Sequence, residues 1–129
     1  MVLDQWRKSV RKQRHATEDV IECPMEATLD LIGGKWKGVI LFRLLKGTLR
    51  FGELRRQLCK ITQRTLTQQL RQLEADGLVS RRVYAEVPPR VEYSLTVRGR
   101  SLDPVLMTLM QWGEDQLANG SRPAHPEPA

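Results

Sequence analysis

Apolar residues recur at helical spacing in four successive segments of the chain, and each segment ends at a glycine or a short link. Apolar side chains three and four residues apart lie on one face of a helix. The pattern therefore predicts helices over about residues 24–32, 35–46, 51–59 and 62–76. The second segment is apolar around most of its circumference, which is typical of a helix in the middle of a core.

Capping residues support the limits of the first and fourth helices. Pro24 suits the first turn of a helix, and Thr62 stands where the N-cap of the fourth helix is expected. Gly77 suits the position just beyond the end of that helix. Only a few residues separate the third and fourth helices, which is the spacing of a helix-turn-helix unit.

Two segments with alternating apolar and polar residues follow, and they predict a β-hairpin. Residues 79–87 and 91–97 alternate in this way, and a Pro-Pro-Arg link at residues 88–90 forms a stiff, basic tip. Thr96 can cap a last helix, in which Pro104 either introduces a kink or separates off the first turn.

This order of elements predicts an α+β, mainly α, fold: a winged helix-turn-helix with a flanking C-terminal dimerisation helix. We expect this domain within residues 21–118. Residues 1–20 form a variable N-terminal arm, either a frayed helix or disordered, and residues 119–129 form a flexible Pro-rich tail.

The positive charge of the chain is concentrated in its middle. The 129 residues contain 21 Lys and Arg against 15 Asp and Glu, a net charge of +6. Residues 33–100 carry 15 of the basic and five of the acidic side chains, so this stretch has a net charge of +10 and the rest −4. Such a stretch favours a polyanionic partner, because neutralised phosphates release counterions from nucleic acid. A solvated basic surface without a partner is the alternative.

The fourth helix has a polar face without carboxylates near its N-terminus. With Leu66 at zero and about 100° per residue, its basic and amide side chains fall on the opposite side of the helix. Glu74 and Asp76 lie at the far end. The candidate residues for reading DNA are Thr62, Gln63, Arg64, Thr65, Thr67, Gln68 and Arg71. The candidate wing residues, which could reach phosphates or the minor groove, are Arg81, Arg82 and Arg90. An ordinary amphipathic surface helix is the alternative.

Four runs of sequence resemble a known family. GGKWKGVILFRLL, LRFGELRR, ITQRTLTQQLRQLEADGLVSRRVY and PPRVEYSLTVRGRSL closely resemble the HxlR-type winged-helix transcriptional regulators, relatives of the MarR-like proteins, over about residues 22–113. The resemblance implies a homodimer that binds a roughly palindromic double-stranded DNA operator and regulates neighbouring genes. Repression is the expected role, although whether such a protein represses or activates depends on where the operator lies relative to the promoter.

The resemblance also gives Cys23 a possible role, since some members of the family sense oxidants or electrophiles through a cysteine before the first core helix. The positive end of the helix dipole favours the thiolate there, while Glu22 and Glu26 oppose it. A small buried residue near the dimer seam is the alternative for Cys23. Cys59 is expected to fill the core.

The first and last helices are expected to form the dimer interface, because the last helix is apolar over a broad face. The residues assigned to this interface are Met25, Leu29, Leu102, Val105, Leu106, Leu109, Met110 and Trp112. Ile32 belongs to the same stripe of the first helix. Burial of that helix in the core of its own chain is the alternative.

Several classes of protein do not fit the sequence. No apolar run is long enough to span a bilayer, no secretory signal is visible, and two cysteines do not suggest a disulfide scaffold, so we expect a cytoplasmic protein without membrane association. We expect no catalytic residues, no metal site and no cofactor, since His15 and His125 lie far from either cysteine and no phosphate-binding loop is present. The remaining functional alternative is a winged-helix module that binds proteins and never DNA.

Overall fold

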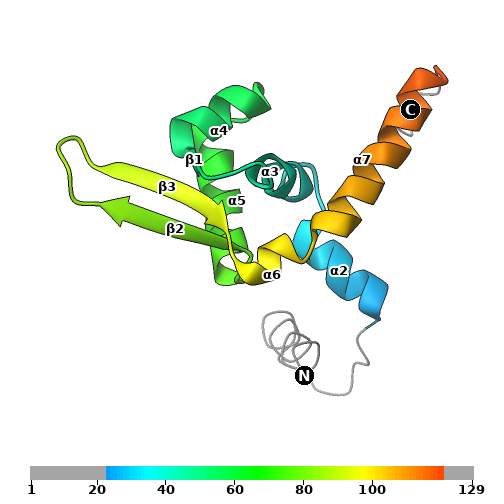
Figure 1. The fold of residues 1–129 in the computed structure, drawn as a ribbon, viewed down its shortest axis with the longest axis horizontal. Helices are drawn as coiled ribbons and strands as arrows, with labels where there is room; N and C mark the ends of the chain where they lie inside the picture. The colour runs from blue at the N-terminus through cyan, green and yellow to red at the C-terminus, as the bar shows by residue number, and fades with distance from the viewer. Residues whose placement is uncertain (1–22, 121–129) are drawn as a thin grey trace.

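The structure is a computed structural model that describes residues 23–120 (Figure 1). The expected N-terminal arm and all but two residues of the expected tail lie outside the described residues. The elements, in chain order, are α2 (Pro24–Ile32), α3 (Lys37–Leu44), β1 (Leu49–Arg50), α4 (Phe51–Leu58), α5 (Gln63–Ala75), β2 (Val79–Tyr84), β3 (Arg90–Leu95), α6 (Val97–Arg100) and α7 (Asp103–Ala118). This order confirms the predicted winged helix-turn-helix, with a C-terminal helix beside it.

The core lies where α3, α4 and α5 meet the sheet. The predicted apolar stripe of α5 is fully buried, as are residues of α3 and α4 that face it; these side chains are Ile40, Leu41, Leu44, Leu54, Leu66, Leu70 and Leu73. The sequence predicts that α3 lies in the middle of the core. One of its apolar residues, Val39, is exposed, because α7 crosses only part of the outer side of α3.

The sheet has three antiparallel strands in the order β1-β3-β2, one more than predicted. The extra strand β1 consists of two residues, Leu49 and Arg50, which pair with Tyr93 and Glu92 of β3. Two residues show no alternation, so the pattern contained no signal for this strand. Both hairpin strands end sooner than predicted, β2 at Tyr84 and β3 at Leu95, and β3 begins one residue earlier, at Arg90.

The short helix α6 holds the end of α5 against the hairpin. The Thr96 hydroxyl caps α6 by accepting from the Gly99 amide at 3.0 Å, and it donates to the Gly77 carbonyl at 2.6 Å. Arg98 donates to the Asp76 carbonyl at 2.6 Å. Burial lowers the pKa of Arg98, and the Asp76 carboxylate partly opposes this effect. Gly99 packs so closely against the Leu78 carbonyl that a Cβ would collide with it.

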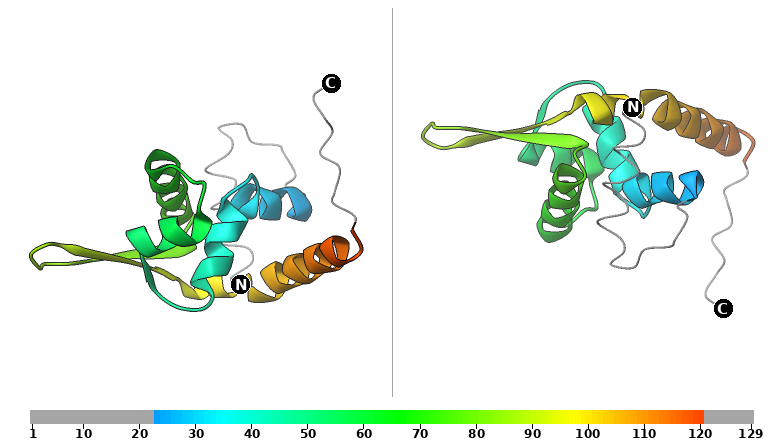
Figure 2. Two further views of the ribbon diagram at one scale, coloured as in Figure 1. Left: turned by 90° about the horizontal axis from the view of Figure 1, so that it is seen from above. Right: turned by 90° about the horizontal axis from the view of Figure 1, so that it is seen from below.

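The predicted last helix is divided at Pro104, which lies in the first turn of α7, so the separation of a first turn is the outcome observed. Helices α2 and α7 project from the end of the molecule opposite the hairpin (Figures 1 and 2). Among residues 23–120, no helix combines the length and the hydropathy needed to cross a membrane.

Candidate nucleic-acid interface

The start of α5 is a well-formed helix N-terminus without acidic residues in its first turn. The Thr62 hydroxyl accepts from the Thr65 amide at 3.1 Å and donates to the Thr65 hydroxyl at 2.9 Å. The Thr67 hydroxyl donates to the Gln63 carbonyl at 2.8 Å. The hydroxyl protons of Thr62 and Thr67 are therefore already used within the helix.

The side chains that remain free on α5 are long and either basic or amidic. Gln63, Arg64, Gln68 and Arg71 are exposed, and none makes a side-chain hydrogen bond or ion pair within the described part of the chain. Together with Thr67 they line a shallow surface depression of about 530 Å³, which we call the outer face of α5. The four free side chains offer hydrogen-bond donors and two positive charges, the groups that bind base edges and phosphates.

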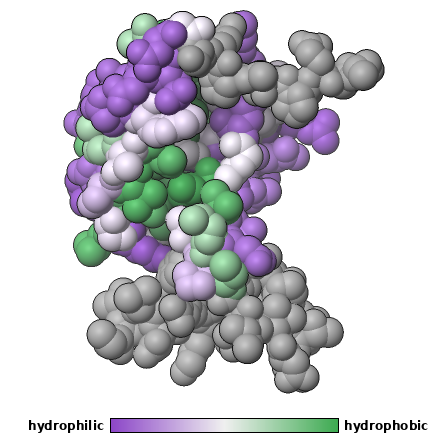
Figure 3. Space-filling view, turned by 90° about the vertical axis from the view of Figure 1, so that its right-hand side faces the viewer, coloured by the Kyte–Doolittle hydropathy of each residue, from purple (hydrophilic) through white to green (hydrophobic). Residues whose placement is uncertain are grey.

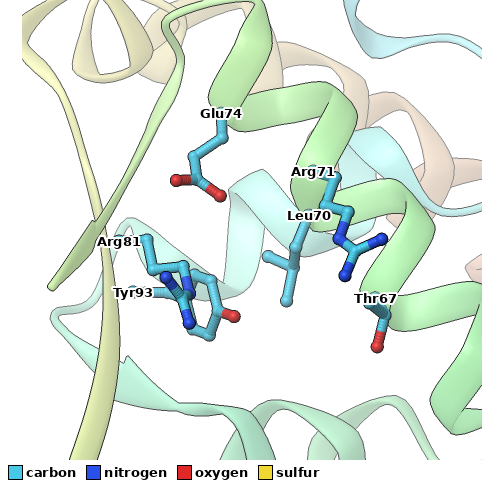
Figure 4. Close-up of a pocket in the computed structure, with 6 residues that line it drawn as sticks. All are labelled: Thr67, Leu70, Arg71, Glu74, Arg81 and Tyr93. Carbon is cyan, nitrogen blue, oxygen red and sulfur yellow. The ribbon is translucent and has the colours of Figure 1, made fainter. Parts of the chain in front are cut away.

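A second, more enclosed space lies behind the outer face, between α5 and the hairpin (Figure 4). This inner cavity has a volume of about 260 Å³ and is lined by Thr67, Leu70, Arg71, Glu74, Arg81 and Tyr93. Thr67 and Arg71 line both the inner cavity and the outer face, so the two are continuous.

The strand register separates the arginines of the hairpin onto two faces. Arg81 pairs with Tyr93 and shares its face of the sheet with the buried Val79, because side chains two residues apart in a strand point the same way. This face is directed at α5. Arg82 pairs with Glu92 and lies on the opposite face, where its guanidinium stacks on the Tyr84 ring at 5.0 Å.

Arg90 also lies on that opposite face and is held by several neighbours, although the sequence places it at a free basic tip. Its guanidinium stacks on the Tyr84 ring at 4.0 Å, and it pairs with Glu86 at 3.4 Å and Glu92 at 3.6 Å. Two carboxylates thus offset its charge. Arg90 is the first residue of β3, and the tip itself lies between Tyr84 and Arg90.

The end of the molecule formed by α2 and α7 exposes a patch of apolar side chains (Figure 3). We call it the apolar face and define it by Met25, Leu29, Val105, Leu109, Met110 and Trp112, all of them exposed. A groove of about 330 Å³ between α3 and α7, lined in part by Val39, Phe42 and Leu109, continues this face.

Three residues assigned to the dimer seam pack within their own chain, two of them buried and one partly buried. Leu106 is 4% exposed and belongs to the core, Ile32 is buried, and Leu102 packs against the core. The first helix therefore divides its apolar residues: Ala27, Leu31 and Ile32 turn inward, while Met25 and Leu29 face outward.

The two cysteines are both exposed. The prediction that Cys59 fills the core is wrong: Cys59 follows α4 with a φ of 57°, in the left-handed region, and Leu58 takes the buried position. Its thiol donates to the Arg56 carbonyl at 3.6 Å. Cys23 stands at the N-cap of α2 and is also exposed in the single chain, so both the sensor role and burial near a dimer seam stay predictions.

Sequence reasoning missed Glu74 and Tyr93 as residues of the site. The alternation makes Tyr93 one of the apolar positions of the second predicted strand, and the sequence puts Glu74 at the far end of the fourth helix. The hairpin register and the packing of α5 on β2 bring both to the inner cavity. A helical wheel of α5 alone carries no signal for this, because the cavity is shared by remote segments.

The fold and this arrangement define the class of protein, that of the winged helix-turn-helix transcriptional regulators. The chain belongs to the HxlR-like helix-turn-helix family, whose model matches residues 31–121. YdeP of Bacillus subtilis (strain 168), named an HTH-type transcriptional regulator, is 55% identical over 100 residues that cover 78% of each chain. YybR of the same strain, which has the same description, is 58% identical over 92 residues, 71% of this chain and 74% of YybR.

Solved structures agree with this assignment. The redox regulator HypR in its oxidized form matches with a TM-score of 0.70 and 57% sequence identity, over 72% of this chain and 96% of the HypR chain. YdeP and YybR are thus named as regulators of transcription, and HypR as a redox regulator.

Proposed function

We propose that the protein is a homodimeric transcriptional repressor that binds double-stranded DNA in a sequence-specific manner. The observation that carries this proposal is the outer face of α5, where two guanidiniums and two amides stand free beside a helix N-terminus without carboxylates. Guanidiniums and amides bind guanine and adenine edges in the major groove, and a helix N-terminus attracts phosphate. Arg82 of the wing adds a basic contact, as does Arg90 with its partly offset charge.

The apolar face supports the homodimer. Six exposed apolar side chains on α2 and α7, at the same end of the molecule, form the kind of surface that a monomeric soluble protein rarely leaves in water. A symmetric pair joined there would present two α5 helices to DNA. Half-sites about 34–36 Å apart, one turn of B-DNA, would then form a roughly palindromic operator.

The test begins with selection of a binding sequence from randomised duplexes, followed by affinity measurements on that operator and on a scrambled duplex. In Arg64→Ala/Gln68→Ala, the preference for the operator should disappear while the dimer remains. Each good bidentate contact to a base provides about 1–3 kcal/mol of discrimination. The matched control is Arg100→Ala/Gln111→Ala, which removes the same side-chain types from exposed positions outside α5.

Operator discrimination that survives in Arg64→Ala/Gln68→Ala would contradict the assigned outer face. A wild-type protein that enriches no duplex would contradict DNA binding itself and favour the protein-interaction module.

We also propose that an oxidant controls the repressor through Cys23. The exposed thiol stands at the first turn of α2, two residues before Met25 of the apolar face, so an adduct there would change the spacing or tilt of the two α5 helices. The similarity to the redox regulator HypR supports this role. With diamide and a free thiol, Cys23 and that thiol lose two electrons and two protons to the azo bond and form a mixed disulfide.

Cys23→Ser should keep its operator affinity under diamide, whereas the wild type should release DNA. Cys59→Ser is the matched control, since Cys59 is the other exposed cysteine, and it should respond like the wild type. If the Cys23→Ser variant still released DNA under diamide, Cys23 would not be the residue that senses the oxidant.

A further inference from the structure

Three charged side chains line the inner cavity. Arg71 comes from α5 and Arg81 from β2, while Glu74 directs its carboxylate into the space between the helix and the hairpin (Figure 4). No ion pair joins these three side chains within residues 23–120, although all of them line the same cavity. The cavity therefore holds two positive charges and one negative charge that no direct pairing neutralises.

Tyr93 contributes a hydrogen-bond donor to the same cavity. Its side chain is 8% exposed, and its hydroxyl has no hydrogen-bond partner in the part of the chain that the structure describes. The ring packs on the face of the sheet next to Arg81, its cross-strand neighbour, and the hydroxyl points into the cavity. A hydroxyl on a nearly buried ring, without a protein partner, requires water or a ligand group.

An anion with several oxygens fits this set of donors. Guanidiniums bind phosphate oxygens in a forked arrangement, and a phenol O–H adds one further donor. One negative charge would offset the net charge of +1 that Arg71, Arg81 and Glu74 leave in the cavity. Thr67 contributes no free proton, because its hydroxyl already donates to the Gln63 carbonyl.

The continuity of the two spaces identifies the source of the anion. Thr67 and Arg71 belong to both the outer face and the inner cavity, so DNA lying on the outer face would bring its backbone to the opening of the cavity. We propose that the inner cavity binds one phosphate of the DNA backbone through Arg71, Arg81 and Tyr93, and that Glu74 competes with this phosphate. This inference rests on the proposed function and adds a residue that limits DNA affinity.

The sharing of one phosphate by two arginines is tested by the salt dependence of binding to a generic duplex. The slope of log affinity against log salt changes by about 0.9 for each phosphate that the protein no longer neutralises. Arg71→Ala/Arg81→Ala should therefore change the slope by about 0.9 in total, whereas two separate phosphates would give about 1.8. Tyr93→Phe should weaken binding about threefold without changing the slope, because it removes a neutral donor.

The role of Glu74 is tested in the same assay. Glu74→Gln should strengthen binding to any duplex about three- to fivefold, since the arginines no longer face a competing carboxylate. This increase should vanish in the Arg71→Ala/Arg81→Ala background. Glu114→Gln is the matched control: it makes the same charge change at an exposed position of α7 and should leave affinity nearly unchanged.

A change in slope of about 1.8 in the double variant would show that Arg71 and Arg81 neutralise two separate phosphates, which contradicts the proposal. Equal affinities of Glu74→Gln and Glu114→Gln for the duplex would show that Glu74 does not compete with the DNA phosphate. Both results presuppose a wild type that binds DNA, so they leave the proposed function standing. Failure of the wild type to bind any duplex would overturn the proposed function and this inference together.

Discussion

Helices α5 and α7 both carry apolar residues, α5 in a narrow stripe and α7 over a broad face, and these residues differ in burial. The 13 residues of α5 bury all three of their leucines at Leu66, Leu70 and Leu73 in the core. The 16 residues of α7 bury only Leu106, while Leu109 is 55% and Trp112 is 61% exposed. Within residues 23–120, the apolar residues of α5 are thus covered by the chain itself, whereas many of those on α2 and α7 are not.

This difference shows how the molecule divides stability from assembly. The core around α3, α4 and α5 holds the outer face of α5 in a defined orientation without help from another chain. The apolar face is not buried by its own chain within the described residues, so its burial would add hydrophobic free energy to the proposed dimer. The sequence pattern indicates which side chains of each helix are apolar, but it does not indicate which surface covers those of α7.

The largest expected effect is on association. Leu109→Glu should weaken the dimer more than about a hundredfold, because the new carboxylate would have to be buried without a partner. Sedimentation velocity at micromolar concentration should then show a monomer with native helix content. Met107→Glu is the matched control: Met107 is 49% exposed on the same helix, about 200° around the axis from Leu109. A dimer that persists in Leu109→Glu would show that this face of α7 does not form the interface.

The next largest effect concerns α6, which joins the two ends of the molecule. Gly99→Ala should lower the free energy of unfolding by about 1–3 kcal/mol, since its Cβ would collide with the Leu78 carbonyl. Gly113→Ala should raise it by about 0.5–1 kcal/mol, because nothing lies within 4 Å of the added carbon and alanine favours the helix. Urea unfolding in the monomeric Leu109→Glu background separates folding from association. An unchanged free energy of unfolding in Gly99→Ala would show that the close contact between α6 and Leu78 does not stabilise the fold.

The smallest effect is confined to the α5 end. Thr62→Ala should cost about 1 kcal/mol of stability, because the Thr65 amide loses its acceptor. Hydrogen exchange of that amide should become faster while the dimer is unchanged. Thr62→Ser keeps the hydroxyl and should behave like the wild type. Equal protection of the Thr65 amide in the alanine and serine variants would contradict the capping role of Thr62.

The helices of this protein could be predicted closely because their signals are local. Thr62 caps α5 and Thr96 caps α6, as the sequence indicates, and Pro104 lies in the first turn of α7, one of the two outcomes that the sequence left open. A cap or a helix-breaking proline acts within a few residues of itself. The two-residue strand β1 had no such signal, since it exists only through its pairing with β3.

The wing and the cysteines show the opposite case. The sequence treats Arg81, Arg82 and Arg90 as one basic arm, whereas the register sends Arg81 toward α5 and the other two to the far face. Arg90 keeps two carboxylate neighbours that the hairpin brings to it. Cys59 is exposed because the chain turns through the left-handed region there, which residue type alone does not indicate.

The order of the elements, their caps, the basic middle of the chain and the family all follow from the amino-acid sequence, because periodicity and charge are properties of neighbouring residues. Tertiary packing determines which arginines share a cavity, why Glu74 and Tyr93 belong with them, and which apolar residues stay exposed. Those outcomes depend on segments far apart in the chain, and only packing sets the distances between them.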